Sequence, residues 1–397
     1  MRVLLLGVGM QGKAALYDLL LSDRVEQITA ADWDIEGLRA HVAGLESYRL
    51  PAARLAPSRL ACEPVDASDA SGLERLFASK PDVVIDLLPP ALSIAAARAA
   101  VAHGAHLVST CYARPEVVAL GADAESRGLS ILPEFGMDPG IDLVLMGAAV
   151  RALDRVDSLR CYGSGIPEPS AADNPLRYKI SWTFEGVLRA YRRPARLVQE
   201  GRLLELSAEE IYAPAHLHTL AVPGMGNLEA IPNGDALSYA PLLGLDPARM
   251  RTLGRYTLRY PGHCDFWRAI VALHLLDEEP VRMNGVEVDR LQYLVTALTP
   301  HLQYEENERD MAILHIEARG MHDGKPAREG YRLIDRKDLE TGLSAMSRAV
   351  GFTASIGAHM IVEGSIERRG LLSPVNDVPC EPFLAHLERR GIQVKRL

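Results

Sequence analysis

Residues 2–21 read Arg-Val-Leu-Leu-Leu-Gly-Val-Gly-Met-Gln-Gly-Lys-Ala-Ala-Leu-Tyr-Asp-Leu-Leu-Leu. The run at 2–6, which is wholly apolar after Arg2, is typical of a strand buried on both faces of a parallel sheet. Three glycines separate it from a segment with helical spacing. In this setting Gly7 allows a tight turn, Gly9 lets the backbone approach a pyrophosphate, and Gly12 permits close packing of the helix. The order of strand, glycine turn and helix therefore predicts a dinucleotide site at a helix N-terminus.

A second apolar segment, residues 27–31, ends at Asp32, twenty residues after Gly12. In dinucleotide-binding folds a carboxylate at this place bonds the ribose hydroxyls of NAD, and its charge repels the 2′-phosphate of NADP. Trp33 and Asp34 follow directly, and no arginine is adjacent. These residues favour NAD as the cofactor without excluding NADP. The alternative is that Asp32 only ends a strand or caps the helix that starts near Asp34.

The alternation of strands and helices continues through the first third of the chain. Apolar strands are expected at 59–65, 82–88 and 105–108, each followed by polar or turn residues, with a helix at 91–103. This pattern predicts a doubly wound parallel sheet of the Rossmann type. The residues expected to contact the cofactor are Gly7, Gly9, Met10, Gln11, Gly12, Asp32, Asp66, Leu88, Pro89 and Thr110.

The pattern changes after residue 132, where long stretches rich in Pro and Gly predict a second domain. Asp138 stands in the Gly-rich segment 133–142, directly before a helical run, and is either an N-cap or a functional carboxylate. Lys179 is one of only six lysines in the chain. The small residues at 344–364 predict a long helix that packs tightly against another element.

Composition excludes several classes of protein. The 397 residues are 48% hydrophobic and carry a net charge of -9, with Lys and Arg scattered, so a nucleic-acid surface is not expected. No segment reaches the roughly 18 apolar residues of a membrane helix. Five widely spaced cysteines without a CxxC motif favour a reducing compartment, the cytoplasm by default. His216 and His218 lack a third ligand at suitable spacing, so no metal site is predicted.

Several segments resemble the saccharopine dehydrogenase superfamily, which includes glutamate-forming saccharopine dehydrogenase and lysine 6-dehydrogenase. The resemblance runs nearly end to end, and its most specific motifs are Gly136-Met-Asp-Pro-Gly-Ile-Asp142 and Asn174-Pro-Leu-Arg-Tyr-Lys-Ile-Ser-Trp182. Further matches lie at 231–233, 257–260, 308–311 and 364–370. The resemblance implies a Rossmann NAD(P)-binding domain at 1–132 and an α/β substrate-binding and dimerisation domain at 133–343. It also implies that the helices at 344–397 return to the first domain.

The resemblance implies substrate contacts as well. Cys111, Asp138, Gly163 and Thr257 take the positions that face the amino-acid substrate in the family. We add three polar residues of the matching segments, Lys179, Asn233 and Arg259, and Tyr112, at the end of the fifth predicted strand. One departure is Gly234, where the reductase has an arginine that would clamp a substrate carboxylate. A second is Asp32, because similar reductases tend to have a basic residue there and use NADP.

The leading hypothesis is an NAD(P)-dependent oxidoreductase that oxidises, or reductively forms, a C–N bond of a lysine-derived amino acid through an imine. Asp138 is the first candidate for the proton acceptor and Lys179 the second, although Lys179 could instead bind the α-carboxylate. The first alternative is a lysine 6-dehydrogenase type of enzyme that acts on free lysine or a related diamino acid. The second is a non-catalytic NAD-binding homologue. The expected partner is a small-molecule amino acid, and a homodimer is expected.

Overall fold

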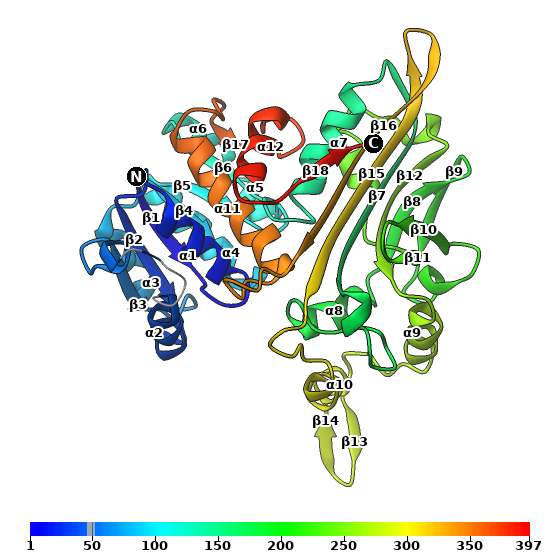
Figure 1. Cartoon of the computed structure of the whole chain (residues 1–397), viewed down its shortest axis with the longest axis horizontal. Coiled ribbons are helices and arrows are strands. Elements are labelled where there is room, and N and C mark those ends of the chain that lie inside the picture. Colours follow the sequence, from blue (N-terminus) through cyan, green and yellow to red (C-terminus); the bar gives the residue numbers. More distant parts are fainter. Residues whose placement is uncertain (46–49, 51) are drawn as a thin grey trace. The chain divides into compact units, whose positions relative to one another are not determined.

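The computed structural model describes residues 1–45, 50 and 52–397, which form two compact units (Figure 1). Unit 1 comprises residues 1–145, 340–343 and 347–393, and unit 2 comprises 146–339, 344–346 and 394–397. The division therefore falls after Leu145, inside a helix, whereas the sequence predicted a boundary after residue 132. Most of the C-terminal segment predicted at 344–397 belongs to unit 1.

Unit 1 is built on a seven-stranded parallel sheet with the order β17-β6-β5-β4-β1-β2-β3. The strands are β1 (Arg2–Leu6), β2 (Gln27–Asp32), β3 (Leu60–Pro64), β4 (Val83–Asp86), β5 (His106–Ser109), β6 (Ser130–Leu132) and β17 (Gly370–Leu371). Its helices are α1 (Gly12–Leu21), α2 (Ile35–Gly44), α3 (Ala70–Leu76), α4 (Pro90–Ala102), α5 (Pro115–Val118), α6 (Gly121–Ser126) and α12 (Cys380–Arg389), together with most of α11 (Ala345–Val362). The predicted doubly wound fold is confirmed.

The strand order of unit 1 reverses at β1, which pairs with β2 on one side and with β4 on the other. Leu4 and Leu6 of β1 and Val84 of β4 have no exposed surface, as the apolar runs of the sequence predicted. In sheets of this type, ligands bind outside the carboxyl ends of the strands at this reversal. The fold therefore predicts a ligand site in the loops after β1, β2, β4 and β5.

Helix α11 packs against α1 within unit 1 through its small residues. A Cβ added to Gly351 would lie 2.5 Å from the carbonyl oxygen of Gln11 and 2.7 Å from the backbone nitrogen of Ala15. The hydroxyl of Ser347 donates to the carbonyl oxygen of Met10, at 2.7 Å. The predicted tight packing of this helix is confirmed. Helix α11 contacts the backbone at Met10 and Gln11, where the glycine turn leads into α1.

Unit 2 contains a mixed nine-stranded sheet whose main path is β10-β11-β12-β7-β15-β16-β18. The central pair β12 and β7 is parallel, and the other pairs are antiparallel. The strands are β7 (Arg155–Pro167), β8 (Ala195–Gln199), β9 (Arg202–Leu206), β10 (His218–Val222), β11 (Gly226–Pro232), β12 (Thr252–Arg259), β15 (Asp310–His322), β16 (Lys325–Arg336) and β18 (Val394–Arg396), and a separate hairpin is formed by β13 (Val281–Met283) and β14 (Val286–Val288).

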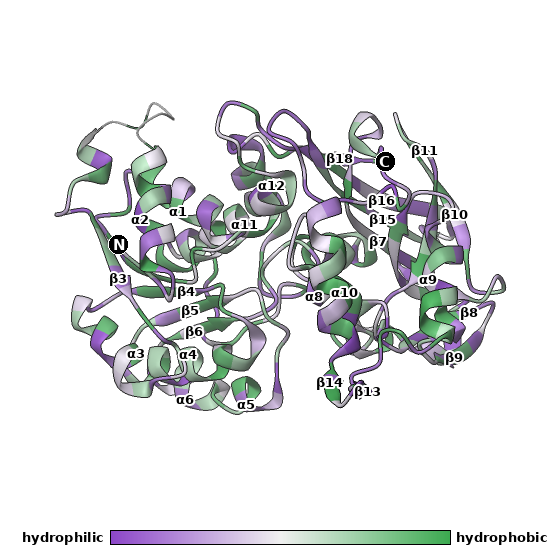
Figure 2. Ribbon diagram, turned by 90° about the horizontal axis from the view of Figure 1, so that it is seen from below, coloured by the Kyte–Doolittle hydropathy of each residue, from purple (hydrophilic) through white to green (hydrophobic). Residues whose placement is uncertain are grey.

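Helices cover the sheet of unit 2 and complete its core. They are α8 (Phe184–Ala190), α9 (His263–Ala272) and α10 (Arg290–Leu298), while α7 (Ile141–Arg151) spans the division between the units. Helices α9 and α10 carry strongly hydrophobic stretches (Figure 2). From these stretches Trp267, Val271 and Leu291 are buried in the core. In the described part of the chain, no helix is long and apolar enough to cross a membrane.

Candidate functional site

The glycine turn after β1 has the geometry that a pyrophosphate requires. Gly7 has φ +85°, a conformation that side chains with a Cβ rarely adopt. A Cβ on Gly12 would lie 2.0 Å from the carbonyl oxygen of Gly7, so α1 can begin this close to the turn only at a glycine. A Cβ on Gly9, by contrast, would meet nothing within 4 Å, which leaves open space over the backbone. The turn and the first N–H groups of α1 thus fit a dinucleotide phosphate.

Asp32 holds this turn as well as ending β2. One carboxylate oxygen accepts a hydrogen bond from the backbone nitrogen of Val8, at 2.6 Å, and the other from that of Asp34, at 3.0 Å. The cap of α2 is Asp34, which accepts from the backbone nitrogen of Gly37 at 2.9 Å. The alternative that Asp32 caps this helix is therefore wrong. Its carboxylate lies against the glycine turn, where a ribose would also lie.

Asp66 stands after β3, farther along the same edge of the sheet. It is exposed, and it accepts hydrogen bonds from the backbone nitrogen (2.9 Å) and the hydroxyl (2.6 Å) of Ser68. These bonds lower the pKa of its carboxyl. The carboxylate stabilises its own loop, and its contact with a cofactor stays a prediction.

The loops after β4 and β5 are joined by a buried polar cluster that the sequence did not reveal. Asp86, with no exposed surface, accepts hydrogen bonds from the hydroxyls of Ser93 and Ser109 and from the backbone nitrogen of Leu88. Cys111 donates from its backbone nitrogen to Ser109 Oγ (3.2 Å) and from Sγ to the Leu88 carbonyl oxygen (3.7 Å). Burial and the nearby Asp86 raise the pKa of the Cys111 thiol to about 11.

The remaining predicted residues of these loops lie around this cluster. Pro89 directly precedes α4, and Thr110 follows β5. The methyl group of Thr110 lies 3.4 Å from the position of a Cβ on Gly136. Tyr112 is 44% exposed, so it lies at the surface of unit 1. The predicted cofactor and substrate residues of unit 1 therefore share the carboxyl edge of its sheet.

The segment around Asp138 forms a tight turn before α7. The backbone nitrogen of Gly136 donates to the carbonyl oxygen of Pro139, and a Cβ on Gly140 would lie 2.0 Å from that of Gly136. Helix α7 begins at Ile141, so the interpretation of Asp138 as its N-cap is wrong. The buried Asp142 closes the turn instead, by accepting from the backbone nitrogen of Gly140 at 2.7 Å. Asp138 is half-buried at the tip of this turn.

In unit 2, three predicted residues lie on neighbouring strands. Gly163 of β7 is opposite Thr257 of β12, and Thr257 is opposite Ile231 of β11. Asn233 follows β11 and donates from its backbone nitrogen to the carbonyl oxygen of Arg255, at 2.9 Å. The strand pairing thus brings Gly163, Thr257 and Asn233 into one region of the sheet.

Lys179 forms ion pairs with two carboxylates. Its Nζ lies 2.6 and 2.7 Å from the two carboxylate oxygens of Glu308 and 3.0 Å from Asp173 Oδ1. Burial alone would lower the pKa of Lys179, but the hydrogen bonds to Glu308 and Asp173 outweigh it, and the pKa is raised. These contacts hold Lys179 in its charged form, which argues against the role of proton acceptor. They also engage all three ammonium protons, so contact with a substrate carboxylate stays a prediction.

Arg259 is a buried cation at the end of β12 and is only 5% exposed. Its Nε donates to the phenol oxygen of Tyr191 (3.0 Å), and its Nη1 donates to the carbonyl oxygen of Leu258 (2.9 Å). The guanidinium also lies 5.2 Å from the centre of the Tyr178 ring. Within the described residues it has no carboxylate partner. An arginine in such surroundings offers a binding point for a substrate carboxylate.

The two histidines considered as a metal pair have other partners. The Nδ1 of His216 lies 3.0 Å from the side-chain oxygen of Gln199, and the Nε2 of His218 lies 3.0 Å from the hydroxyl of Tyr162.

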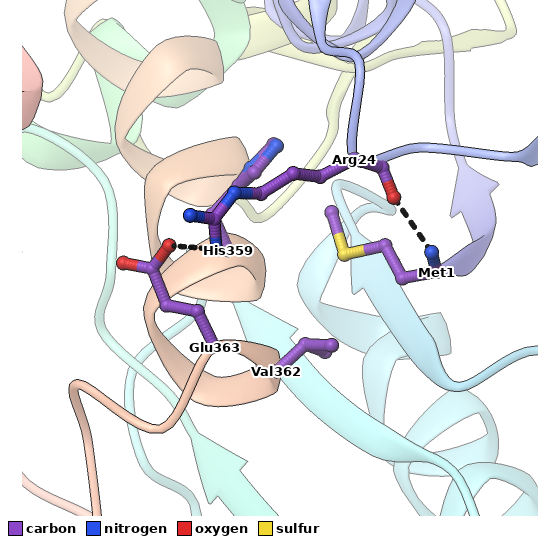
Figure 3. Close-up of a pocket in the computed structure, with 5 residues that line it drawn as sticks. All are labelled: Met1, Arg24, His359, Val362 and Glu363. Atoms are coloured by element: carbon purple, nitrogen blue, oxygen red, sulfur yellow. Dashed lines mark hydrogen bonds and ion pairs between the residues drawn. The ribbon is translucent and has the colours of Figure 1, made fainter.

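Unit 1 also contains a cavity of about 260 Å³ at the amino end of β1 (Figure 3). It is lined by Met1, Arg24, His359, Val362 and Glu363, and Arg24 pairs with Glu363 at 2.9 Å. This cavity lies at the edge of the sheet opposite the glycine turn.

Two family models match nearly the whole chain. Residues 3–132 match the saccharopine dehydrogenase NADP binding domain, and residues 136–392 match the saccharopine dehydrogenase C-terminal domain. The chain belongs to the saccharopine dehydrogenase family. This membership confirms the resemblance found in the sequence motifs.

Curated relatives within the saccharopine dehydrogenase family cover the chain to different extents. The chain is 26% identical to saccharopine dehydrogenase [NADP(+), L-glutamate-forming] of Schizosaccharomyces pombe, over 99% of this chain and 98% of the relative. It is 27% identical to alpha-aminoadipic semialdehyde synthase of Arabidopsis thaliana, over 83% of this chain but only 38% of the relative. The chain thus spans under half the length of the second protein.

A solved structure supports the fold. The apo saccharopine dehydrogenase (L-Glu forming) of Saccharomyces cerevisiae superposes with a TM-score of 0.83 at 24% identity, covering 100% of this chain and 99% of the other. The family model for the N-terminal domain is described as NADP binding, which supports a nicotinamide cofactor. The preference for NAD inferred from Asp32 receives no support from these comparisons, because the two full-length yeast relatives are named for NADP(+).

Proposed function

We propose that this protein is a nicotinamide-dependent dehydrogenase that acts on the C–N bond of a saccharopine-like amino acid. The observation that carries the proposal is the match of both family domains to one chain whose glycine turn fits a dinucleotide phosphate. The bound cofactor would accept hydride from the carbon next to the amine nitrogen. Loss of hydride from that carbon and of a proton from the nitrogen gives an imine, and water then hydrolyses the imine to an amine and a carbonyl compound.

The chain's own residues would bind the substrate and take up the proton. We assign Asp138 the role of proton acceptor, because it is the carboxylate at the tip of the turn before α7. We assign Arg259 the binding of a substrate carboxylate, because it is a buried cation that has no carboxylate partner among the described residues. Because its raised pKa keeps Lys179 charged, Lys179 cannot accept a proton and is not the base in this proposal.

The position of Gly234 bears on the choice of substrate. Gly234 has φ +64°, and the Cδ and Nη1 of Arg193 lie 3.6 and 3.9 Å from where its Cβ would stand. The guanidinium of Arg193, from another segment of unit 2, therefore lies beside Gly234, the position at which the family resemblance implies that an arginine has been lost. Because saccharopine carries three carboxylates, this cation favours saccharopine over free lysine, which carries one.

We propose NADP as the cofactor, following the family model and the names of the yeast relatives. Asp32 had pointed to NAD, but its two oxygens already accept backbone hydrogen bonds that stabilise the glycine turn. That structural use is a reason for a carboxylate at this position apart from ribose recognition. Asp32 remains the residue whose replacement tests the preference.

The test is an absorbance assay for reduced nicotinamide with purified protein. Saccharopine, lysine and other opines are each offered with NADP and with NAD. Turnover of saccharopine with NADP is the expected result. Turnover of free lysine alone would support the lysine 6-dehydrogenase type of enzyme. Measurable nucleotide binding without turnover of any substrate would support the non-catalytic homologue instead.

We also propose a homodimer in a reducing compartment such as the cytoplasm. Within the described residues the five cysteines form no disulfide, and thiols persist in reducing surroundings. Light scattering of the purified protein tests the dimer, since a monomeric mass would contradict it.

A further inference from the structure

The cluster around Asp86 lies where the reacting half of the cofactor should lie, if the proposed function holds. Asp32, at the end of β2, marks the side of the sheet that takes the adenosine half. The reversal of strand order puts β4 and β5 on the other side of β1. A dinucleotide that crosses the turn at Gly7 therefore directs its nicotinamide half toward the loops that follow Asp86 and Ser109.

The hydrogen bonds around Asp86 suit a charged carboxylate. The backbone nitrogen of Leu88 can only donate, and it lies 3.1 Å from Asp86 Oδ1. Ser109 Oγ accepts from the backbone nitrogen of Cys111, so its own hydrogen is free to point at Asp86, at 2.9 Å. Ser93 supplies the third donor. Three donors around one carboxyl group favour its ionised form, whereas burial opposes ionisation and raises its pKa.

An ionised carboxylate at position 86 destabilises the folded protein, because burial removes it from water. Asp86 has no exposed surface, and within the described residues it forms no ion pair with Lys, Arg or His. Its neighbours along β4 are Val83, Val84 and Ile85, so an apolar residue would continue the strand without the cost of desolvation. Stability alone does not explain a carboxylate here. A positive charge that arrives with a ligand would explain it.

We propose that the Asp86 carboxylate is the electrostatic partner of the nicotinamide half of the cofactor. The oxidised nicotinamide ring is positively charged and the reduced ring is neutral, so this carboxylate stabilises the oxidised form when bound. The cluster also fixes the carbonyl oxygen of Leu88 and the thiol of Cys111. In a purely structural role, Asp86 would position these groups without interacting with the charge of the cofactor. The two roles differ in their effect on the two redox forms of the cofactor.

The experiment measures dissociation constants of the whole protein for NADP⁺ by calorimetry and for NADPH by fluorescence. In Asp86→Asn, which keeps the size of the side chain but removes its charge, we expect the Kd for NADP⁺ to rise about tenfold. The Kd for NADPH should change less than about twofold, because the neutral ring gains little from a nearby charge. Each constant is compared with that of the unmodified chain.

The matched control is Asp82→Asn, which removes the same charge directly before the amino end of β4. Asp82 is partly exposed and bonds to the backbone nitrogen of Arg2, at 2.7 Å, on the opposite edge of the sheet. It should leave the ratio of the two constants unchanged. If Asp86→Asn does not fold, Asp86→Ser removes the charge while keeping a hydroxyl that can accept from Leu88.

The outcomes separate this inference from the proposed function. Equal weakening of NADP⁺ and NADPH binding, or no weakening of either, would overturn the role of Asp86 while leaving a nicotinamide enzyme intact. Failure of the unmodified chain to bind any nicotinamide nucleotide would overturn both. A selective loss of NADP⁺ affinity supports the inference, even if the amino-acid substrate differs from saccharopine.

A second readout needs no nucleotide. The Asp86 charge contributes to the raised pKa of the Cys111 thiol, so removing it should increase the rate of Cys111 alkylation at a fixed alkaline pH. Peptide mass spectrometry distinguishes Cys111 from the other cysteines. An unchanged rate in Asp86→Asn would mean that the carboxyl group is already neutral in the free protein, and this would overturn the inference.

Discussion

The ammonium group of Lys179 lies between both carboxylate oxygens of Glu308, at 2.6 and 2.7 Å, although 129 residues separate the two in sequence. Lys179 follows the buried Tyr178 in the motif that resembles the family, and Glu308 precedes β15. The side chains are 6% and 17% exposed, so water screens their charges only in part. This pair holds the ammonium group of Lys179 in its charged form inside unit 2.

We predict that Glu308→Gln lowers the free energy of unfolding by about 1–3 kcal/mol, because the ammonium group of Lys179 loses its main partner. Asp173→Asn is the control, since Asp173 is 63% exposed and water screens its pair with Lys179, so its effect should be much smaller. Urea denaturation at neutral pH measures both. Equal effects of the two variants would contradict the dominance of Glu308.

The same pair predicts how stability changes with pH. Because the pKa of Lys179 is raised in the folded state, its stabilisation is complete below the unfolded lysine value of about 10.4. It is lost as the pH rises through the higher folded value. The difference in unfolding free energy between the unmodified chain and Glu308→Gln should therefore shrink at strongly alkaline pH. A difference that grows there would be inconsistent with this pairing.

Asp32 allows a test of cofactor preference. We predict that Asp32→Ala increases affinity for NADPH relative to NADH by about tenfold, because the negative charge no longer opposes the 2′-phosphate. Asp34→Asn removes a carboxylate charge two residues away, in the cap of α2, and should leave the ratio unchanged. Fluorescence titration with both nucleotides measures the ratio. An unchanged ratio in Asp32→Ala would show that Asp32 serves only to hold Val8 and the glycine turn.

Gly351 is predicted to be intolerant of even a methyl group. Although alanine is the better helix former, Gly351→Ala should lower the free energy of unfolding by about 1–3 kcal/mol, because its Cβ would overlap the Gln11 carbonyl. Gly44→Ala in α2 is the matched control, since a Cβ there meets nothing within 4 Å. It should raise stability by up to about 1 kcal/mol. In thermal unfolding we expect the melting temperature of Gly351→Ala to fall and that of Gly44→Ala to rise.

The parts of the fold that the sequence predicted are those decided by nearby residues. The apolar run at 2–6 and the glycines that follow it are local signals, and the structure has β1, the turn and α1 as expected. The same holds for β2, β4 and β5. The apolar segment predicted at 82–88 ends at Asp86, because the chain turns there with a hydrogen bond from the nitrogen of Leu88 to the Asp86 side chain.

The parts that could not be predicted depend on contacts between distant residues. The N-terminus of α11 is capped by Asp310, which accepts from the backbone nitrogens of Ala345 (2.7 Å) and Met346 (3.0 Å). No local pattern announces a cap 35 residues away. The cluster around Asp86 could not be predicted for the same reason, since its donors Ser93 and Ser109 come from separate elements. Lys179 was recognised, but its carboxylate partners and therefore its charge state were not.

Asp138 is predicted to affect turnover more than binding. Asp138→Asn should lower kcat about 100-fold or more, because the amide cannot accept the proton from the substrate amine. The Kd for the nucleotide and the melting temperature should stay near those of the unmodified chain. Asp142→Asn is a contrasting variant that should instead destabilise the fold, since Asp142 is buried and holds the nitrogen of Gly140. Near-normal turnover of Asp138→Asn would remove Asp138 from the mechanism.

Arg193 tests the substrate directly. If its guanidinium, which lies over Gly234, binds one of the three carboxylates of saccharopine, Arg193→Ala should raise KM for saccharopine about tenfold with little change in kcat. Any turnover of free lysine should be unaffected, because lysine lacks the additional carboxylates. Arg249→Ala, at a position whose side chain is 88% exposed and pairs with Asp246, is the control and should change neither constant. A parallel loss with both substrates would mean that Arg193 supports the fold of unit 2 and does not select the substrate.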